Sequence, residues 1–167
     1  MHTDELIGVR EYLSTSYDPD CDYVDGVVME RNVGEYDHAR LLRALIVHFH
    51  SHRREWGVHV FPGLRVQVSS TRFRVPDVCV VAGPNPTEQI LTQPPFICIE
   101  ILSPEDLFTA MQEKIRDYLN MGVPYVFIID PRAREAWRCT PDGHQVVAEL
   151  RTENPAIAVP VAALFEE

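Results

Sequence analysis

The spacing of apolar residues along the chain predicts three helices. Between 37 and 55 apolar residues recur every three or four positions, which is the spacing of one helix face. The residues of this face are Leu41, Leu42, Leu45, Ile46 and Phe49. A second helix is expected to follow Ser103 and to run to Met121, because serine is a favourable N-cap and Gly122 suits a helix end. A short helix is expected over 4–13.

Compact apolar blocks between these helices predict strands. They are expected near 58–61 and 64–68, at 74–82, 96–102 and 125–130, and in a terminal hairpin of 135–140 and 144–151. The turn signal Asp25-Gly26 predicts a further hairpin within 22–32. A run of strands followed by a strand–helix–strand unit predicts an α/β or α+β fold with a mixed sheet. Without a repeat or a linker, the 167 residues predict one domain, 1–167.

The charge of the chain is unevenly distributed. A net charge of −10 argues against a protein that coats nucleic acid without specificity. The segment 38–76, however, holds seven arginines and a single acid, Glu55. These arginines are Arg40, Arg43, Arg53, Arg54, Arg65, Arg72 and Arg74. The segment predicts either a surface that contacts phosphates or a solvated helix face with arginines at strand edges.

The compartment is predicted from what the sequence lacks. No apolar run approaches the roughly 18 residues that span a membrane, so no membrane contact is expected. The first twenty residues carry acids and no apolar core of a signal peptide. Four cysteines lie far apart without zinc-finger spacing, and Cys79 and Cys98 fall in apolar runs as small core residues. We therefore expect a reduced, cytoplasmic protein.

Glu100 interrupts the apolar block 96–102, although a buried, unpaired carboxylate is costly. Strand alternation places it with Cys98 and Leu102, on the face opposite the isoleucines of the block. Three explanations are open: a lysine or arginine partner, a metal ion, or a wet cleft.

Lys114 and Asp77 are the residues that could explain a buried Glu100. Lys114 is the only lysine in the chain, and it falls on the apolar stripe of its helix, between Met121 and Leu107. Asp77 follows a proline and precedes an apolar strand. Two acids and a lysine at one sheet edge could bind Mg²⁺, activate water and hydrolyse a phosphodiester. Equally, Lys114 and Glu100 could form a buried ion pair, with Asp77 at a surface strand end.

Several segments together resemble a known family. They read "YVDGVVMERN" and "DHARL" between Tyr23 and Leu41, then "RVPDVCVV", "ICIEILSP" and "EKIRDYLNMGVPYVFIIDP". They resemble the Uma-two family of restriction-endonuclease-like proteins in the PD-(D/E)XK nuclease superfamily. The resemblance runs from about Tyr23 to Trp137 and keeps the order of the motifs.

The resemblance implies a restriction-endonuclease-like mixed sheet flanked by helices, and a DNA endonuclease that uses Mg²⁺ or Mn²⁺. A homodimer is expected because cutting both strands with one site per chain usually takes two chains. It implies that Asp77 and Glu100 are metal ligands and that Glu30 is a third acid of the metal site. It also implies that Lys114 is the catalytic lysine, displaced from the superfamily's usual position, here Leu102. The resemblance places a histidine near the cleft, which is His38 in this chain.

Other functions are open to the same sequence. The chain departs from the family pattern at Leu107, Ala110 and Tyr125, where a basic residue, an aspartate and an acid are common. A module that keeps the nuclease fold to bind nucleic acid or protein, without turnover, is one alternative. Hydrolysis of a small phosphoester is another.

Overall fold

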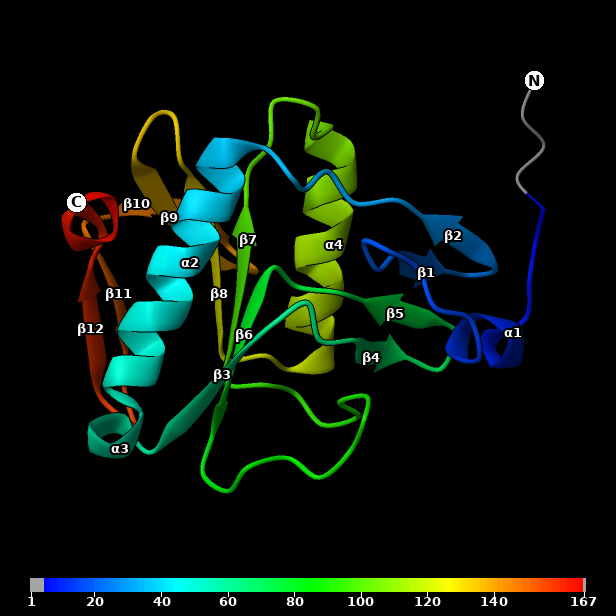
Figure 1. Ribbon diagram of the computed structural model, residues 1–167, viewed down its shortest axis with the longest axis horizontal. Coiled ribbons are helices and arrows are strands. Elements are labelled where there is room, and N and C mark those ends of the chain that lie inside the picture. Colours follow the sequence, from blue (N-terminus) through cyan, green and yellow to red (C-terminus); the bar gives the residue numbers. More distant parts are fainter. Residues whose placement is uncertain (1–4, 167) are drawn as a thin grey trace.

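The computed structural model describes residues 5–166 (Figure 1). The helices are α1 (Val9–Leu13), α2 (Tyr36–Ser51), α3 (Arg53–Trp56), α4 (Phe108–Met121) and the 3₁₀ helix η1 (Val161–Phe165). The strands are β1 (Asp22–Val24), β2 (Val27–Met29), β3 (Val58–Pro62), β4 (Val66–Ser69), β5 (Arg72–Arg74), β6 (Val78–Ala82), β7 (Ile97–Ile101), β8 (Tyr125–Asp130), β9 (Glu135–Thr140), β10 (Gly143–Val147), β11 (Glu149–Thr152) and β12 (Ile157–Pro160).

The strands form three sheets. The largest has the order β10-β9-β8-β7-β6-β3, and within it β7 and β8 are parallel while the other neighbours are antiparallel. A second sheet has the order β2-β1-β5-β4, and β11 pairs with β12. The mixed α/β architecture predicted from the sequence is therefore confirmed, with α4 as the connection between the parallel strands.

The large sheet is covered on both faces (Figure 1). On one face, Ile97, Ile99 and Ile101 of β7 pack in a core with the apolar stripe of α2 and with β11, β12 and η1. On the other face, Cys98 packs in a second core with Ile115 of α4. Successive residues of β7 thus face opposite cores, as strand alternation requires, and Glu100 belongs to the α4 side.

The short strands and the helix ends differ from the prediction. The single strand expected at 74–82 is two strands in different sheets, because Val75, Pro76 and Asp77 carry the chain from β5 to β6. Pro76 has no N–H to donate to a neighbouring strand, and this favours the end of one strand before it and the start of another after it. The helix expected at 37–55 is interrupted at His52 into α2 and α3.

The start of α4 was predicted too early. Ser103 is not its N-cap, because the helix begins at Phe108 after Leu107. Instead, the Asp106 carboxylate accepts the Ser103 N–H at 2.8 Å, and the Asp106 N–H donates to the Ser103 carbonyl at 3.1 Å. Asp106, which the sequence placed in the first turn of the helix, therefore closes a tight turn before the helix begins.

The chain ends also contain differences. The helix expected over 4–13 is confirmed only from Val9 to Leu13, with 5–8 not helical and residue 4 outside the described residues. The terminal hairpin is confirmed as β9 and β10, but the strand expected at 144–151 is divided between β10 and β11. The latter pairs with β12 in a separate sheet that was not predicted. None of the helices within residues 5–166 is both long and apolar enough to cross a bilayer.

The cysteines give a first testable prediction. All four are buried and free, and burial raises the pKa of both Cys79 and Cys139 to about 12. At pH 8 these groups are neutral thiols, which are poor nucleophiles. We expect the native protein to react very slowly with 5,5′-dithiobis(2-nitrobenzoate) and to titrate all four thiols in denaturant. Rapid reaction of any thiol in the native protein would contradict the packing described here.

Candidate functional site

The two predicted acids lie beside the same end of the β6–β7 ladder. The antiparallel pairing ends with Val78 opposite Ile99, and Asp77 directly precedes Val78 while Glu100 directly follows Ile99. The Asp77 Oδ2 atom accepts the N–H of Ile101 at 2.8 Å. Asp77 is only 5% exposed and Glu100 2% exposed, so Asp77 is not the surface strand end that one sequence interpretation proposed.

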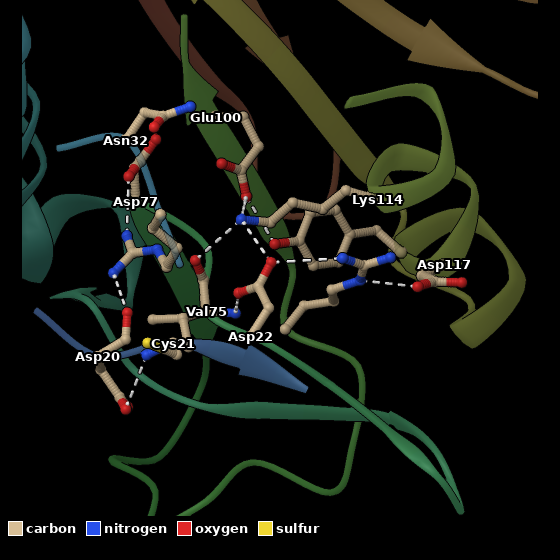
Figure 2. Close-up of polar contacts among 12 residues, drawn as sticks. Asp20, Cys21, Asp22, Asn32, Val75, Asp77, Glu100, Lys114 and Asp117 are labelled. Carbon is tan, nitrogen blue, oxygen red and sulfur yellow. Dashed lines mark hydrogen bonds and ion pairs between the residues drawn. The ribbon is translucent and has the colours of Figure 1, made fainter. Parts of the chain in front are cut away.

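Lys114 joins these acids from the helix. Its stripe neighbours Ile115 and Tyr118 pack on the same face of the sheet, which turns Lys114 inward with 8% of its surface exposed. Figure 2 shows its Nζ atom beside Glu100 and Asp22, at 3.1 Å from Glu100 Oε1 and 3.2 Å from Asp22 Oδ2. It also donates a hydrogen bond to the Val75 carbonyl at 3.2 Å. The lysine partner predicted for Glu100 is therefore present.

Glu100 is a strongly perturbed carboxyl group. Burial raises its pKa to about 8, although the Lys114 charge and a 2.6 Å hydrogen bond donated by the Tyr118 hydroxyl act in the opposite direction. The charged form of Glu100 is thus incompletely compensated by its neighbours. A carboxylate in this condition gains from any additional cation placed beside it.

Asp77 has a different environment, which favours its charged form. Burial alone would raise its pKa, but contact with His38 and the charges of Lys114 and Arg31 hold it down at about 2. Arg31 Nη2 lies 2.8 Å from Asp77 Oδ1, and His38 Nε2 lies 3.2 Å from the same oxygen without hydrogen-bond geometry. The structure thus brings His38, predicted only to lie near the cleft, into contact with Asp77.

Arg31, Asp77, Glu100 and Lys114 border one cavity of about 100 Å³ between the large sheet, α4 and the segment after β2, whereas His38 does not line it. The charged residues that line it include Asp22, Glu30, Arg31, Asp77, Glu100 and Lys114. Glu30 lies on the exposed rim, and its role as a third ligand stays a prediction. Within residues 5–166 no three or more aspartate, glutamate, histidine or cysteine side chains form a group that could hold a metal ion.

The residues present nevertheless fit a divalent cation of the Mg²⁺ type. Such a cation usually keeps several waters and binds through one or two carboxylates together with substrate phosphates, without an all-protein cage. Asp77 and Glu100 supply two oxygen-only ligands beside a cavity.

Asp22 is a site residue that the sequence prediction missed. It begins β1, where it accepts the Val75 N–H at 2.8 Å through Oδ1 and contacts Lys114 through Oδ2. Arg74 lies 3.4 Å from the same Oδ2 and also pairs with Asp117 of α4 at 2.7 Å (Figure 2). Asp22 therefore fastens the segment before Asp77 to the catalytic lysine candidate. The sequence did not indicate that Asp22 is buried, because a charged residue next to a predicted hairpin turn is usually exposed.

Replacing Asp22 with asparagine tests this role. The amide oxygen can still accept the Val75 N–H, but Lys114 and Arg74 each lose one carboxylate partner. We expect the free energy of unfolding in urea to fall by about 1–3 kcal/mol. Asp25→Asn is the matched control in the same hairpin, where Asp25 is exposed and pairs with Arg72. It should change stability little, and equal effects of the two variants would contradict a special role for Asp22.

The basic segment predicted to contact phosphates is partly neutralised within the fold. Arg65 pairs with Asp20 at 2.7 Å, and Arg74 is buried between Asp22 and Asp117. Arg72 pairs with Asp25, Glu113 and Asp117. Three of the seven arginines thus hold elements together, because acids distant in sequence reach them. The local charge count overstated the basic surface.

Comparisons with known proteins give a structural neighbour and a family. A crystal structure from Anabaena variabilis, described as a putative nuclease belonging to DUF820, matches with a TM-score of 0.80 and 21% sequence identity, over 95% of this chain and 97% of that chain. This likeness shows that the two chains share one fold. Comparison with curated proteins gives no match. The family model Uma2, described as "Putative restriction endonuclease", matches residues 9–165. The chain therefore belongs to the Uma2 family.

Proposed function

We propose that this protein is a metal-dependent DNA endonuclease that hydrolyses phosphodiester bonds. The observation that carries the proposal is the convergence of Asp77, Glu100 and Lys114 at one cavity, in a chain of a restriction endonuclease family. The water oxygen forms a bond to phosphorus, the bond from phosphorus to the leaving sugar oxygen breaks, and the water proton is lost as the leaving oxygen gains one.

Asp77 and Glu100 are the proposed ligands of Mg²⁺ or Mn²⁺, with Glu30 as a third acid if its exposed side chain turns inward. When bound, the cation would lower the pKa of water and offset charge on the phosphoryl group. The hydrogen bond from the Ile101 N–H fixes the position of the Asp77 carboxylate, and its low pKa keeps it charged. Glu100 is held by Tyr118, which fixes one of its oxygens.

Lys114 is proposed to act as a fixed positive charge. Burial lowers its pKa, but the charges of Asp22, Glu100 and Asp77 raise it by more, so the amine stays protonated at neutral pH. A protonated amine cannot accept a proton from water. It can stabilise negative charge that develops on the phosphoryl oxygens, which is a large contribution in a site shielded from solvent.

The alternative is a binding module without turnover, and a specific observation favours it. Lys114 already bridges Glu100 and Asp22, so these ion pairs can connect the elements of the fold without a metal ion. Such a module would take up no Mg²⁺ or Mn²⁺. A small-phosphoester hydrolase would show turnover without affinity for polymers. Salt-dependent DNA affinity separates these, because phosphate contacts release counterions.

Incubation with supercoiled plasmid and with single-stranded DNA, in Mg²⁺, in Mn²⁺ and in EDTA, tests the proposal. We expect the native protein to nick the plasmid only with metal, and Glu100→Ala and Lys114→Ala to be inactive. Circular dichroism must show that both variants are folded. Absence of cleavage by a folded native protein that takes up no Mg²⁺ or Mn²⁺ would support the binding module instead.

A homodimer and a cytoplasmic location remain parts of this proposal. A chain with one site needs a second chain, or a second encounter, to cut both strands of a duplex. Light scattering of the protein with and without a duplex measures whether two chains assemble.

A further inference from the structure

Arg31 lines the candidate cavity, but the roles proposed above leave it without a task. It follows β2 on the segment that leads to α2, and its side chain is 10% exposed. Nη2 lies 2.8 Å from Asp77 Oδ1, and Nη1 donates a long hydrogen bond of 3.4 Å to the Asp20 carbonyl. Its Nε–H is buried without a hydrogen-bond partner among the described residues. A buried guanidinium normally has its donors satisfied.

Arg65 shows how this fold satisfies a structural arginine. Its Nε and Nη2 both donate to the Asp20 carboxylate, each at 2.7 Å, and Nη1 donates to the Tyr12 carbonyl at 3.2 Å. The guanidinium also lies 4.2 Å above the Tyr12 ring. Arg31, by contrast, has a single strong contact and spare donors at the wall of a cavity.

The other cations that line the cavity are committed elsewhere. Lys114 lies between Glu100 and Asp22, and Arg74 between Asp22 and Asp117, although Arg74 also has one unpartnered nitrogen. The carboxylate that Arg31 pairs with is Asp77, which is itself the proposed metal ligand. Lys114 keeps Asp22 as a second carboxylate partner when a cation engages Glu100, whereas a cation at Asp77 would take the only carboxylate that Arg31 contacts.

Both oxygens of Asp77 are already in use. Oδ2 accepts the backbone N–H of Ile101, and Oδ1 faces Arg31 and His38. A divalent cation on Asp77 repels the positively charged guanidinium of Arg31 more strongly than it repels the backbone N–H of Ile101. Arg31, carried by a segment outside the strands and helices, is the group free to give way.

We propose that Arg31 binds the phosphodiester substrate: it pairs with Asp77 in the metal-free protein and, once a cation engages Asp77, transfers its guanidinium to a phosphate oxygen. The chemistry suits this exchange, because a guanidinium presents two parallel N–H groups that match a phosphate as they match a carboxylate. The inference rests on the metal-dependent cleavage proposed above. It names the residue that makes metal binding and substrate binding depend on each other.

The first test measures Mn²⁺ binding without DNA, by calorimetry. Removing the competing cation in Arg31→Gln should tighten Mn²⁺ binding about tenfold, since a like charge beside a ligand opposes the metal. Arg116→Gln is the matched control, because it removes one exposed arginine from α4, and it should leave the affinity within about twofold of native. A folded Arg31→Gln protein that binds Mn²⁺ no more tightly than native would overturn the inference.

The second test measures the affinity for a 20-base-pair DNA duplex in Ca²⁺ against salt concentration. Loss of one phosphate contact should lower the slope of log K against log salt by about 0.9 in Arg31→Gln and not in Arg116→Gln. An unchanged slope would overturn the phosphate contact. If the native protein binds no Mn²⁺, the proposed function itself is overturned. If the native protein binds Mn²⁺ but Arg31→Gln does not bind it more tightly, only the inference about Arg31 is overturned.

Arg31→Lys keeps the test decisive if Arg31→Gln does not fold. Lysine retains the charge beside Asp77, so Mn²⁺ affinity should stay near native. It lacks the planar fork, so kcat/KM for cleavage should fall about tenfold. Native cleavage by Arg31→Lys would overturn the role of the guanidinium.

Discussion

Replacing Lys114 with methionine is expected to abolish cleavage and to destabilise the fold at the same time. Methionine fills the buried stem, but Glu100 and Asp22 lose the ammonium that lies 3.1 Å and 3.2 Å from their oxygens. Leaving buried carboxylates without their cation typically costs about 3–5 kcal/mol. Loss of a fixed charge at the reacting phosphoryl group should lower kcat by about 10²–10³-fold. Urea unfolding and plasmid nicking measure the two effects.

Two controls separate these effects. Arg116→Met removes an exposed cation from the same helix and should change neither stability nor nicking appreciably. The double variant Lys114→Met/Glu100→Gln should recover part of the lost stability, because the amide no longer needs a cation, while nicking stays absent. A Lys114→Met protein as stable as native would mean that the ion pair contributes nothing.

Replacing Glu100 with glutamine is expected to abolish metal uptake and leave the fold intact. The amide oxygen can still accept the Tyr118 hydroxyl, and Lys114 keeps Asp22 as a partner. Changes to groups that merely support a metal ligand cost about 10–100-fold in affinity, so loss of a ligand's charge should cost at least as much. Calorimetry with Mn²⁺ measures the affinity, and circular dichroism checks the fold. Native Mn²⁺ affinity in the variant would remove Glu100 from the site.

The same variant should change how stability depends on pH. Burial raises the pKa of Glu100 to about 8 in the folded protein, above its ordinary value of 4.5. The folded state then holds a proton that the unfolded state has lost, so the stability of the native protein should decline as pH rises from about 5 to 8. Glu100→Gln should flatten this decline, whereas Glu105→Gln, at an exposed position, should not. Parallel declines in both variants would contradict the perturbed pKa.

The candidate site residues that the sequence predicted are charged residues at positions where the surrounding apolar pattern predicts burial. Glu100 inside an apolar strand and Lys114 on an apolar helix stripe both violate the pattern around them, and each is the other's partner. Such violations mark functional or strained positions because a buried charge persists only with compensation. Asp77 was found through its place before an apolar strand and through the family motif.

The residues that the sequence did not predict lack such a conflict. Asp22 and Arg31 flank a hairpin turn, and there a charged residue is ordinary. They are buried because the hairpin β1–β2 lies against the segment that leads into β6. Arg31 contacts Asp77 and Asp22 contacts Val75, and the two residues of each pair are about fifty residues apart in sequence. The split of 74–82 into two strands in different sheets has the same origin. Periodicity reports the local element, whereas these features depend on how distant elements meet.

The most direct test of the account is anomalous diffraction from crystals soaked with Mn²⁺. The account predicts a single strong anomalous peak in the cavity, within coordinating distance of one carboxylate oxygen from each of Asp77 and Glu100, with Lys114 beside it. It also predicts that Arg31 has left Asp77 in that state. Soaked crystals with no peak between the two carboxylates, and with the Lys114–Glu100 pair unchanged, would contradict a metal-dependent nuclease site and leave a buried ion pair in its place.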